Sequence, residues 1–347
     1  MGPAAGRVQP CMILAKLPAA QPLGADWRRQ WREAVTDPRQ LLALLDLGHL
    51  ADRVPAAPPH GFALRVPLGF VARMRRGDAA DPLLRQVLPL DAELEEVAGY
   101  GTDAVGDLAA RSAHGVLQKY RGRALLIATG ACAVHCRYCF RRHFPYAEES
   151  ASSARWWSAL QAIDADHAIN EVILSGGDPL SLSTRRLAEF TTGLAGIAHV
   201  RRLRIHTRLP VVLPERVDAE LSQWLGSVPL RKVVVIHANH AREIDAGVAA
   251  AMSALTASGA TLLNQSVLLK GVNDDARALA DLSETLFDAG VLPYYLHQLD
   301  AVRGAAHFQV DDAQARELHR ELRALLPGYL VPRLVREVPG ELAKTPL

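Results

Sequence analysis

Six short apolar runs recur along the chain after residue 122, and their spacing restricts the fold more than any other feature. The runs are Arg123–Ala128, Glu171–Leu174, Arg202–His206, Lys232–His237, Thr261–Leu268 and Leu292–Leu296. After the first gap, the runs start about 30 residues apart, which is the length of a strand followed by a helix. Good helix candidates, such as Ala246–Ser258 and Asp275–Ala289, lie between them. The pattern predicts six βα units and a parallel sheet, either open or curved into an incomplete barrel.

Polar residues end most of these predicted strands. The strand ends are Ser175-Gly176-Gly177-Asp178, His206-Thr207-Arg208, His237-Ala238-Asn239-His240, Asn264-Gln265-Ser266 and His297-Gln298. In a barrel these ends meet at one mouth, whereas in an open sheet they would be spread along an edge. The sequence therefore favours an α/β fold with an incomplete (β/α)6 barrel and a site at its mouth.

Two further regions flank the predicted barrel of residues 111–300. Residues 1–110 contain helix candidates from Trp27 to Val35 and from Pro38 to Leu47, and nothing in this region indicates chemistry. Residues 301–347 contain a helix candidate from about Asp311 to Leu325, followed by an apolar tail with several prolines. Because this tail is too apolar for a solvated linker, we expect it to dock on the barrel.

Composition limits the partners that the protein can bind. The 39 basic and 37 acidic residues nearly cancel, so no basic excess is available for nucleic acid. No stretch approaches the ~20 apolar residues of a membrane span, and the N-terminus lacks the layout of a secretory signal. Three of the four cysteines are clustered, which favours a reducing compartment over a disulfide framework. We therefore expect a cytoplasmic protein.

Cys132, Cys136 and Cys139 follow the first predicted strand with the spacing C-x3-C-x2-C. Three protein thiolates leave one position of a metal centre open, which suits an iron–sulfur cluster that binds a further ligand. The alternative is a structural zinc site completed by His135, Cys11 or a distant residue. Zinc sites usually take two short ligand pairs from separate places, and no second pair is present.

This cysteine run, with Tyr138 before the last cysteine, resembles the radical S-adenosylmethionine superfamily. In that superfamily the open iron of a [4Fe-4S] cluster binds S-adenosylmethionine, and an electron from the cluster cleaves it. The resemblance implies that Gly176, Gly177 and Asp178, after the second strand, help to seat S-adenosylmethionine.

Five segments together resemble the lysine 2,3-aminomutase family. They are Cys132–Tyr146, Ser175–Pro179, Asn264–Asp274, Pro293–Asp300 and Val335–Leu347. That family combines radical chemistry with pyridoxal 5'-phosphate held on a lysine near the end of the catalytic domain, and Lys344 matches this lysine. By its position alone, Lys344 would be a solvated tail residue. The clostridial type has a run of glycines here, of which this chain keeps only Gly340.

The resemblance also assigns a substrate site. Arg141 matches the arginine that binds the carboxylate of lysine. Asp300 and Glu337 match two acids that bind the ε-ammonium, and the clostridial type has Asp at the second position. Further candidate contacts of pyridoxal phosphate are Lys119, Tyr120, Arg123, Asn264, Gln265 and Ser266.

The implied activity is an L-lysine 2,3-aminomutase that moves the α-amino group to the β carbon with the help of an external one-electron reductant. The run Cys-Arg-Tyr-Cys-Phe-Arg-Arg-His-Phe-Pro-Tyr and the end three residues after Lys344 resemble the short bacterial branch. That branch supplies β-lysine for elongation factor P and its β-lysine ligase. The alternatives are a glutamate or arginine 2,3-aminomutase, and a non-catalytic metal-bearing interaction protein. The oligomeric state stays open, a homo-oligomer included.

Overall fold

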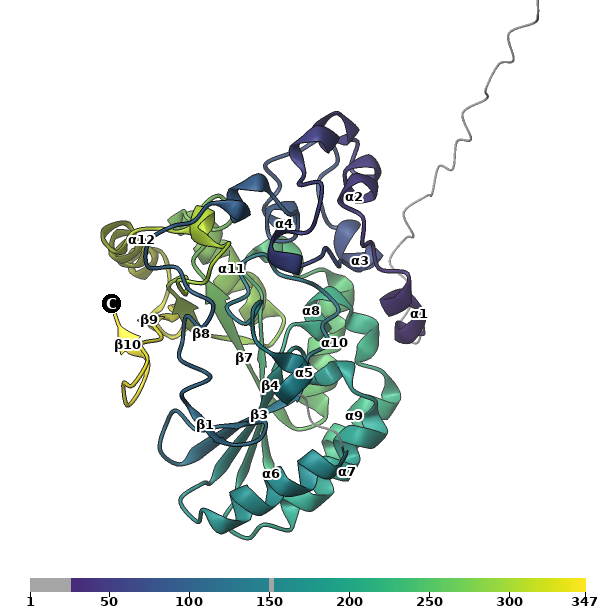
Figure 1. Cartoon of the computed structure of the whole chain (residues 1–347), viewed down its shortest axis with the longest axis vertical. Helices are drawn as coiled ribbons and strands as arrows, with labels where there is room; N and C mark the ends of the chain where they lie inside the picture. The colour runs from purple at the N-terminus through teal and green to yellow at the C-terminus, as the bar shows by residue number, and fades with distance from the viewer. Residues whose placement is uncertain (1–25, 150–152) are drawn as a thin grey trace, which may run out of the picture.

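The computed structural model describes residues 26–149 and 153–347, and within these the strands form one ten-stranded sheet in chain order (Figure 1). The six predicted strands are all present: β3 (Arg123–Thr129), β4 (Glu171–Gly176), β5 (Arg202–Thr207), β6 (Arg231–Ile236), β7 (Ala260–Val267) and β8 (Leu292–His297). Each is parallel to the next. The predicted α/β class is confirmed.

Helices connect these strands and cover one face of the curved sheet (Figure 1). They include α6 (Ser153–Ala165), α7 (Thr184–Ala195), α9 (Ala219–Ser227), α10 (Ala246–Ala257), α11 (Ala276–Asp288) and α12 (Asp312–Leu325). Aspartates start four of them, because the carboxylates of Asp218, Asp245, Asp275 and Asp311 accept hydrogen bonds from backbone N–H groups of the first turn.

Alternate strand residues face the helices and the barrel interior. Leu203 and Ile205 of β5 are buried in the main hydrophobic core together with Leu187 of α7. The intervening side chains, Arg204 and His206, are polar and half-buried. Because successive residues of a strand point to opposite faces, the apolar set packs on the helices and the polar set lines the interior.

The N-terminal region is built from short helices joined by irregular chain. They are α1 (Trp27–Arg32), α2 (Pro38–Leu44), α3 (Leu68–Val71), α4 (Pro82–Arg85) and the 3-10 turn η3 (Asp91–Leu94). The helix predicted from Trp27 to Val35 ends earlier because the backbone of Val35 pairs with Val66 instead. Leu41 and Phe70 belong to the same core as the barrel. Cys11 lies outside the described residues.

The C-terminal tail continues the sheet. Strand β9 (Arg333–Arg336) is parallel to β8, and β10 (Thr345–Pro346) is antiparallel to β9. At the other edge, β1 (Arg111–Ala113) and β2 (Val116–Leu117) are antiparallel. Lys344 therefore lies directly before the last strand of the sheet. In the part of the chain that the structure covers, no helix is both long and apolar enough to span a membrane.

Candidate active site

The loop after β3 carries the three cysteines, which form no disulfide and are half-buried. Burial and the neighbouring Cys136 raise the pKa of Cys139 to about 11. Burial, Asp178 and the other two cysteines raise the pKa of Cys132 well above its usual range. The three sulfurs are thus close enough to repel one another as thiolates, and a bound cationic centre would remove this repulsion.

The donor set consists of three free cysteines on one loop, one ligand fewer than the four of a structural zinc site. A [4Fe-4S] cluster binds each thiolate to a different iron, so it does not need the sulfurs to converge on one point.

Gly176 and Gly177 bring the end of β4 against the cysteine loop. A Cβ on Gly177 would lie 2.6 Å from the carbonyl oxygen of Ala131, and one on Gly176 would lie 2.6 Å from that of Thr129. Gly176 also has a φ of 118°, which side chains rarely adopt. The two glycines therefore let β4 pass directly beside the loop that carries Cys132.

The carboxylate of Asp178 is fully engaged by the protein. It accepts hydrogen bonds from the Thr207 hydroxyl at 2.7 Å and from the backbone N–H groups of Leu180, Arg208 and Leu209. These bonds tie the end of β4 to the start of α8 (Leu209–Val212). A contact of this segment with S-adenosylmethionine would therefore use its backbone rather than the Asp178 side chain.

Glu93 of the N-terminal region anchors the cysteine loop from the other side. Its Oε2 lies 2.5 Å from guanidinium nitrogens of both Arg137 and Arg142, and all three side chains are 0% exposed. Arg137 also donates from Nε to the other oxygen of Glu93 at 2.8 Å. One buried carboxylate thus fixes two arginines of the loop that carries the cysteines.

Lys344 is turned inward by the tail. Its ammonium lies 2.5 Å from Oε2 of Glu337 and 5.8 Å from the ring centre of Tyr295, and its side chain is 22% exposed. Glu337 also accepts a hydrogen bond from the Tyr120 hydroxyl at 2.7 Å and lies 3.6 Å from the ammonium of Lys119. Burial alone would raise the pKa of Glu337, but the Lys344 ammonium and the hydrogen bonds outweigh it and lower that pKa. The structure thus brings four of the predicted residues together: Lys344, Glu337, Tyr120 and Lys119.

Tyr120, which precedes β3, and Arg123, its first residue, lie beside the ion pair of Lys344 and Glu337. The guanidinium carbon of Arg123 lies 5.2 Å from the centre of the Tyr120 ring. Burial and the hydrogen bond to Glu337 raise the pKa of Tyr120 far above its usual range, so its hydroxyl stays protonated as a donor.

Arg141 is buried and held by Asp107, which the sequence did not indicate. Its Nε lies 2.6 Å from Asp107, and its Nη1 lies 2.9 Å from the Ser175 hydroxyl. Asp107 also lies 2.7 Å from the ammonium of Lys119. The sequence of residues 1–110 does not indicate chemistry, yet Asp107 of this region contacts two predicted site residues, Arg141 and Lys119. The irregular chain around Asp107 carries no periodic signal that could have placed it here.

Asp300 follows β8, and its carboxylate interacts electrostatically with Lys344 and Glu337. Burial raises its pKa to about 7, the Lys344 ammonium opposes this shift, and the Glu337 carboxylate reinforces it. Within the described chain, no hydrogen bond or ion pair engages its carboxylate. Asp300 is therefore an acid whose oxygens are available to a cation that enters the site.

Comparison of the sequence with known proteins identifies the family of this chain. No family model matches the chain. A protein of Escherichia coli named L-lysine 2,3-aminomutase is 49% identical over 330 residues, which cover 94% of this chain and 95% of the relative. The chain belongs to the L-lysine 2,3-aminomutase family. The Haemophilus influenzae relative of the same name is 47% identical over 320 residues, 92% of this chain and 95% of its own.

A more distant relative agrees with this aminomutase assignment. The Clostridium subterminale L-lysine 2,3-aminomutase is 31% identical over 331 residues, which cover 93% of this chain and 77% of that protein. Among solved structures, a radical SAM methyltransferase from Sphaerobacter thermophilus matches with a TM-score of 0.44 and 16% identity, over 64% of this chain and 68% of its own. The sequence prediction of an aminomutase is confirmed by the curated relatives.

Three histidines, His206, His237 and His297, line the interior of the aminomutase barrel. From the sequence they were identified only as polar residues at strand ends. Burial lowers the pKa of His237 to about 3, and burial also lowers those of His206 and His297 well below the usual range. Nε2 of Gln265 lies 3.1 Å from Nε2 of His237. At neutral pH the interior therefore offers uncharged imidazoles beside the cations of Arg141 and Lys344.

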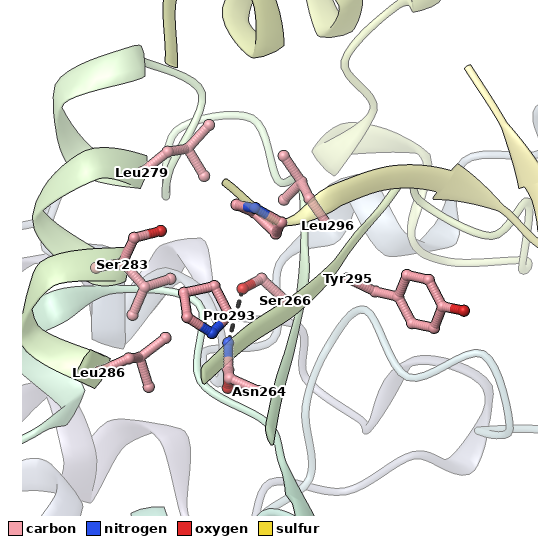
Figure 2. A pocket seen from close by; sticks show the side chains of 10 residues that line it. Asn264, Ser266, Leu279, Ser283, Leu286, Pro293, Tyr295 and Leu296 are labelled. Carbon is pink, nitrogen blue, oxygen red and sulfur yellow. Dashed lines mark hydrogen bonds between the residues drawn. The ribbon is translucent and has the colours of Figure 1, made fainter. Parts of the chain in front are cut away.

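The predicted triplet Asn264, Gln265 and Ser266 is divided by the alternation of β7. Gln265 faces the interior, whereas Asn264 and Ser266 face α11 and line a small cavity of about 10 Å³ (Figure 2). There Asn264 donates to the Ser266 hydroxyl at 2.9 Å, and it also bonds the backbone of Ala238. Figure 2 also shows the Tyr295 ring pointing away from this cavity. Of the triplet, only the Gln265 side chain lies on the interior side of the sheet, beside His237.

Proposed function

We propose that this aminomutase converts L-lysine into β-lysine at the barrel mouth. The observation that carries the proposal is that the tail brings Lys344 beside Glu337 and into the electrostatic field of Asp300. In the proposal, Cys132, Cys136 and Cys139 hold a [4Fe-4S] cluster, and Lys344 holds pyridoxal 5'-phosphate. When bound, the cluster and S-adenosylmethionine supply one-electron chemistry, and pyridoxal phosphate carries the migrating amino group.

Arg141 would bind the carboxylate of the substrate. Asp107 engages its Nε and Ser175 its Nη1, which leaves Nη2 for a substrate oxygen. The guanidinium is held by a buried partner before the substrate arrives, so little side-chain entropy is lost on binding. Asp107 thus acts as a positioning residue for Arg141.

Asp300 and Glu337 would bind the ε-ammonium. An ammonium beside Asp300 would lower its raised pKa and ionise it, because a nearby opposite charge favours the charged form. Glu337 is neutralised by Lys344 in this structure. Once the amine of Lys344 holds the cofactor, Glu337 is left to a second cation.

The pair of acids also bears on the choice of substrate. Glutamate would bring a second carboxylate toward Asp300 and Glu337, where like charges repel. Arginine would bring a cation, but a broader one than an ammonium. The names of the relatives favour lysine.

On the motifs of the cysteine loop, we extend the proposal to the cellular role of the enzyme. It would supply β-lysine for elongation factor P in the cytoplasm and would take its electron from an external one-electron reductant.

The test is a product assay without oxygen. The reconstituted protein, with about four iron per chain, is incubated with L-lysine, S-adenosylmethionine and dithionite, and the products are resolved on a chiral column. We expect β-lysine, and none when S-adenosylmethionine or pyridoxal phosphate is omitted. Faster turnover of L-glutamate or L-arginine by the loaded protein would refute lysine as the substrate.

A further inference from the structure

Arg208, at the end of β5, contacts a cysteine sulfur from behind the loop. Its Nη1 lies 2.8 Å from Sγ of Cys136, and the same nitrogen also contacts the Tyr138 hydroxyl. The Arg208 side chain is only 7% exposed. None of the roles proposed above uses this guanidinium.

Two buried groups hold the opposite side of the guanidinium. Nη2 of Arg208 lies 2.9 Å from Oε2 of Glu243 and 2.7 Å from Oε1 of Gln86. Asn239 donates to Gln86 and to the Tyr138 hydroxyl, which closes the network. The Glu243 side chain is 0% exposed. If Arg208 turned away from Cys136, buried Glu243 would lose the ion pair at its Oε2 and Gln86 would lose one of its donors.

Only a forked cation suits this position. The planar guanidinium of Arg208 reaches Cys136 and Tyr138 with one nitrogen and Glu243 and Gln86 with the other. A lysine carries a single compact ammonium and could not serve both sides at once.

We propose that Arg208 raises the reduction potential of the cluster by donating a hydrogen bond to the ligand sulfur of Cys136. This inference rests on the proposed cluster at the three cysteines. Reduction by the external one-electron donor adds one negative charge to the cluster, and no bond is made or broken in that step. A cationic donor at a ligand sulfur stabilises the added charge, since hydrogen bonds to the sulfurs set the potential of such clusters.

Glu243 acts in the opposite sense. Its carboxylate lies on the far side of the guanidinium and offsets part of the positive charge that the cluster experiences. Removing that charge while keeping the side chain's shape, as in Glu243→Gln, should leave Arg208 more effective. We therefore expect substitutions at Arg208 and Glu243 to shift the reduction potential of the cluster in opposite directions.

The test is a potentiometric titration of the reconstituted protein, followed by the electron paramagnetic resonance signal of the reduced cluster. It is run without S-adenosylmethionine or lysine. For Arg208→Gln we expect about a tenfold lower ratio of reduced to oxidised cluster at a fixed potential, which is about 59 mV for a one-electron couple. Glu243→Gln should shift the midpoint to higher potential. Arg204→Gln is the matched control, because Arg204 forms a comparable pair with Glu171, the first residue of β4.

Each outcome decides the matter. An unchanged midpoint in Arg208→Gln with full iron content would overturn the inference. If Arg208→Gln does not fold, Glu243→Gln decides, and an unchanged midpoint there overturns the inference too. If the unsubstituted chain binds no cluster, the proposed function itself fails.

Discussion

The ammonium of Lys344 lies 2.5 Å from a carboxylate oxygen of Glu337, seven residues earlier in the chain. The two face each other because Thr345 of β10 pairs with Arg336 of β9 in antiparallel register. Gly340, with a φ of 86°, lies in the turn between these strands. The ion pair is therefore set by a hairpin at the edge of the sheet, and a charged residue near the C-terminus is directed into the protein.

Replacing Lys344 with alanine should abolish the retention of pyridoxal phosphate and leave the cluster in place. The expected protein is inactive and lacks the visible absorbance of the bound cofactor after desalting, yet it keeps about four iron per chain. The exposed Lys270 provides the control, since Lys270→Ala should retain the cofactor. Cofactor trapped by borohydride on the Lys344→Ala protein would assign the anchor to another lysine.

Lysine binding should weaken as the pH falls through about 7. Burial raises the pKa of Asp300 to about 7, so the acid becomes neutral and loses its attraction for an ammonium below that pH. KM for lysine, measured from about pH 6 to about pH 8, should rise about tenfold toward acid in the unsubstituted protein. Asp300→Asn should show a uniformly high KM without this dependence. An identical pH profile in both proteins would contradict the assignment.

Asp300 should also lower stability at neutral and alkaline pH. The folded protein holds a proton on Asp300 that the unfolded chain releases from its ordinary pKa of 3.8 upward, so stability falls as the pH rises from there to about 7. Asp300→Asn should therefore be more stable than the unsubstituted protein at pH 8, on the order of 2 kcal/mol, and closer to it at pH 4. Thermal unfolding at both pH values measures this. The exposed Asp288 is a control position, at which Asp→Asn should not reproduce the pattern.

Asp107→Asn should impair substrate binding through Arg141. The neutral amide holds the guanidinium less firmly than the carboxylate that now lies 2.6 Å from it. We expect KM for lysine to rise about tenfold, equal to about 1.4 kcal/mol, with a smaller effect on kcat. A fall in kcat at constant KM would instead point to a role in the chemistry.

Gly177→Ala should displace the cysteine loop. The added Cβ would lie 2.6 Å from the carbonyl oxygen of Ala131, and backbone cannot yield as a flexible side chain does. Iron content after reconstitution should fall, with a loss of stability of about 1–3 kcal/mol. Gly226→Ala is the matched control, because a Cβ there meets nothing within 4 Å. Equal iron content in the two variants would show that the close packing at Gly177 is not needed.

The sequence predicted the parts of this protein that repeat. The predicted strand Arg202–His206 differs from β5 by one residue, since β5 ends at Thr207. Such a strand can be predicted because its alternation of apolar and polar residues is visible without knowledge of its partners. The same period, applied to β7, would have separated Gln265 from Asn264 and Ser266. The pairing of Asp107 with Arg141 could not be foreseen, since it joins irregular segments 34 residues apart. The contact of Gln86 with Arg208, across 122 residues, is of the same kind.

The buried carboxylate of Glu93 makes the cysteine loop depend on the N-terminal region for its charge balance. Arg137 and Arg142 would be left as two buried, unbalanced cations if the N-terminal region were removed or replaced by one without an acid at this place. Chimeras between this chain and its relatives should therefore exchange both segments together. The short helices before the barrel thus supply the buried charge that the arginines of the cysteine loop require.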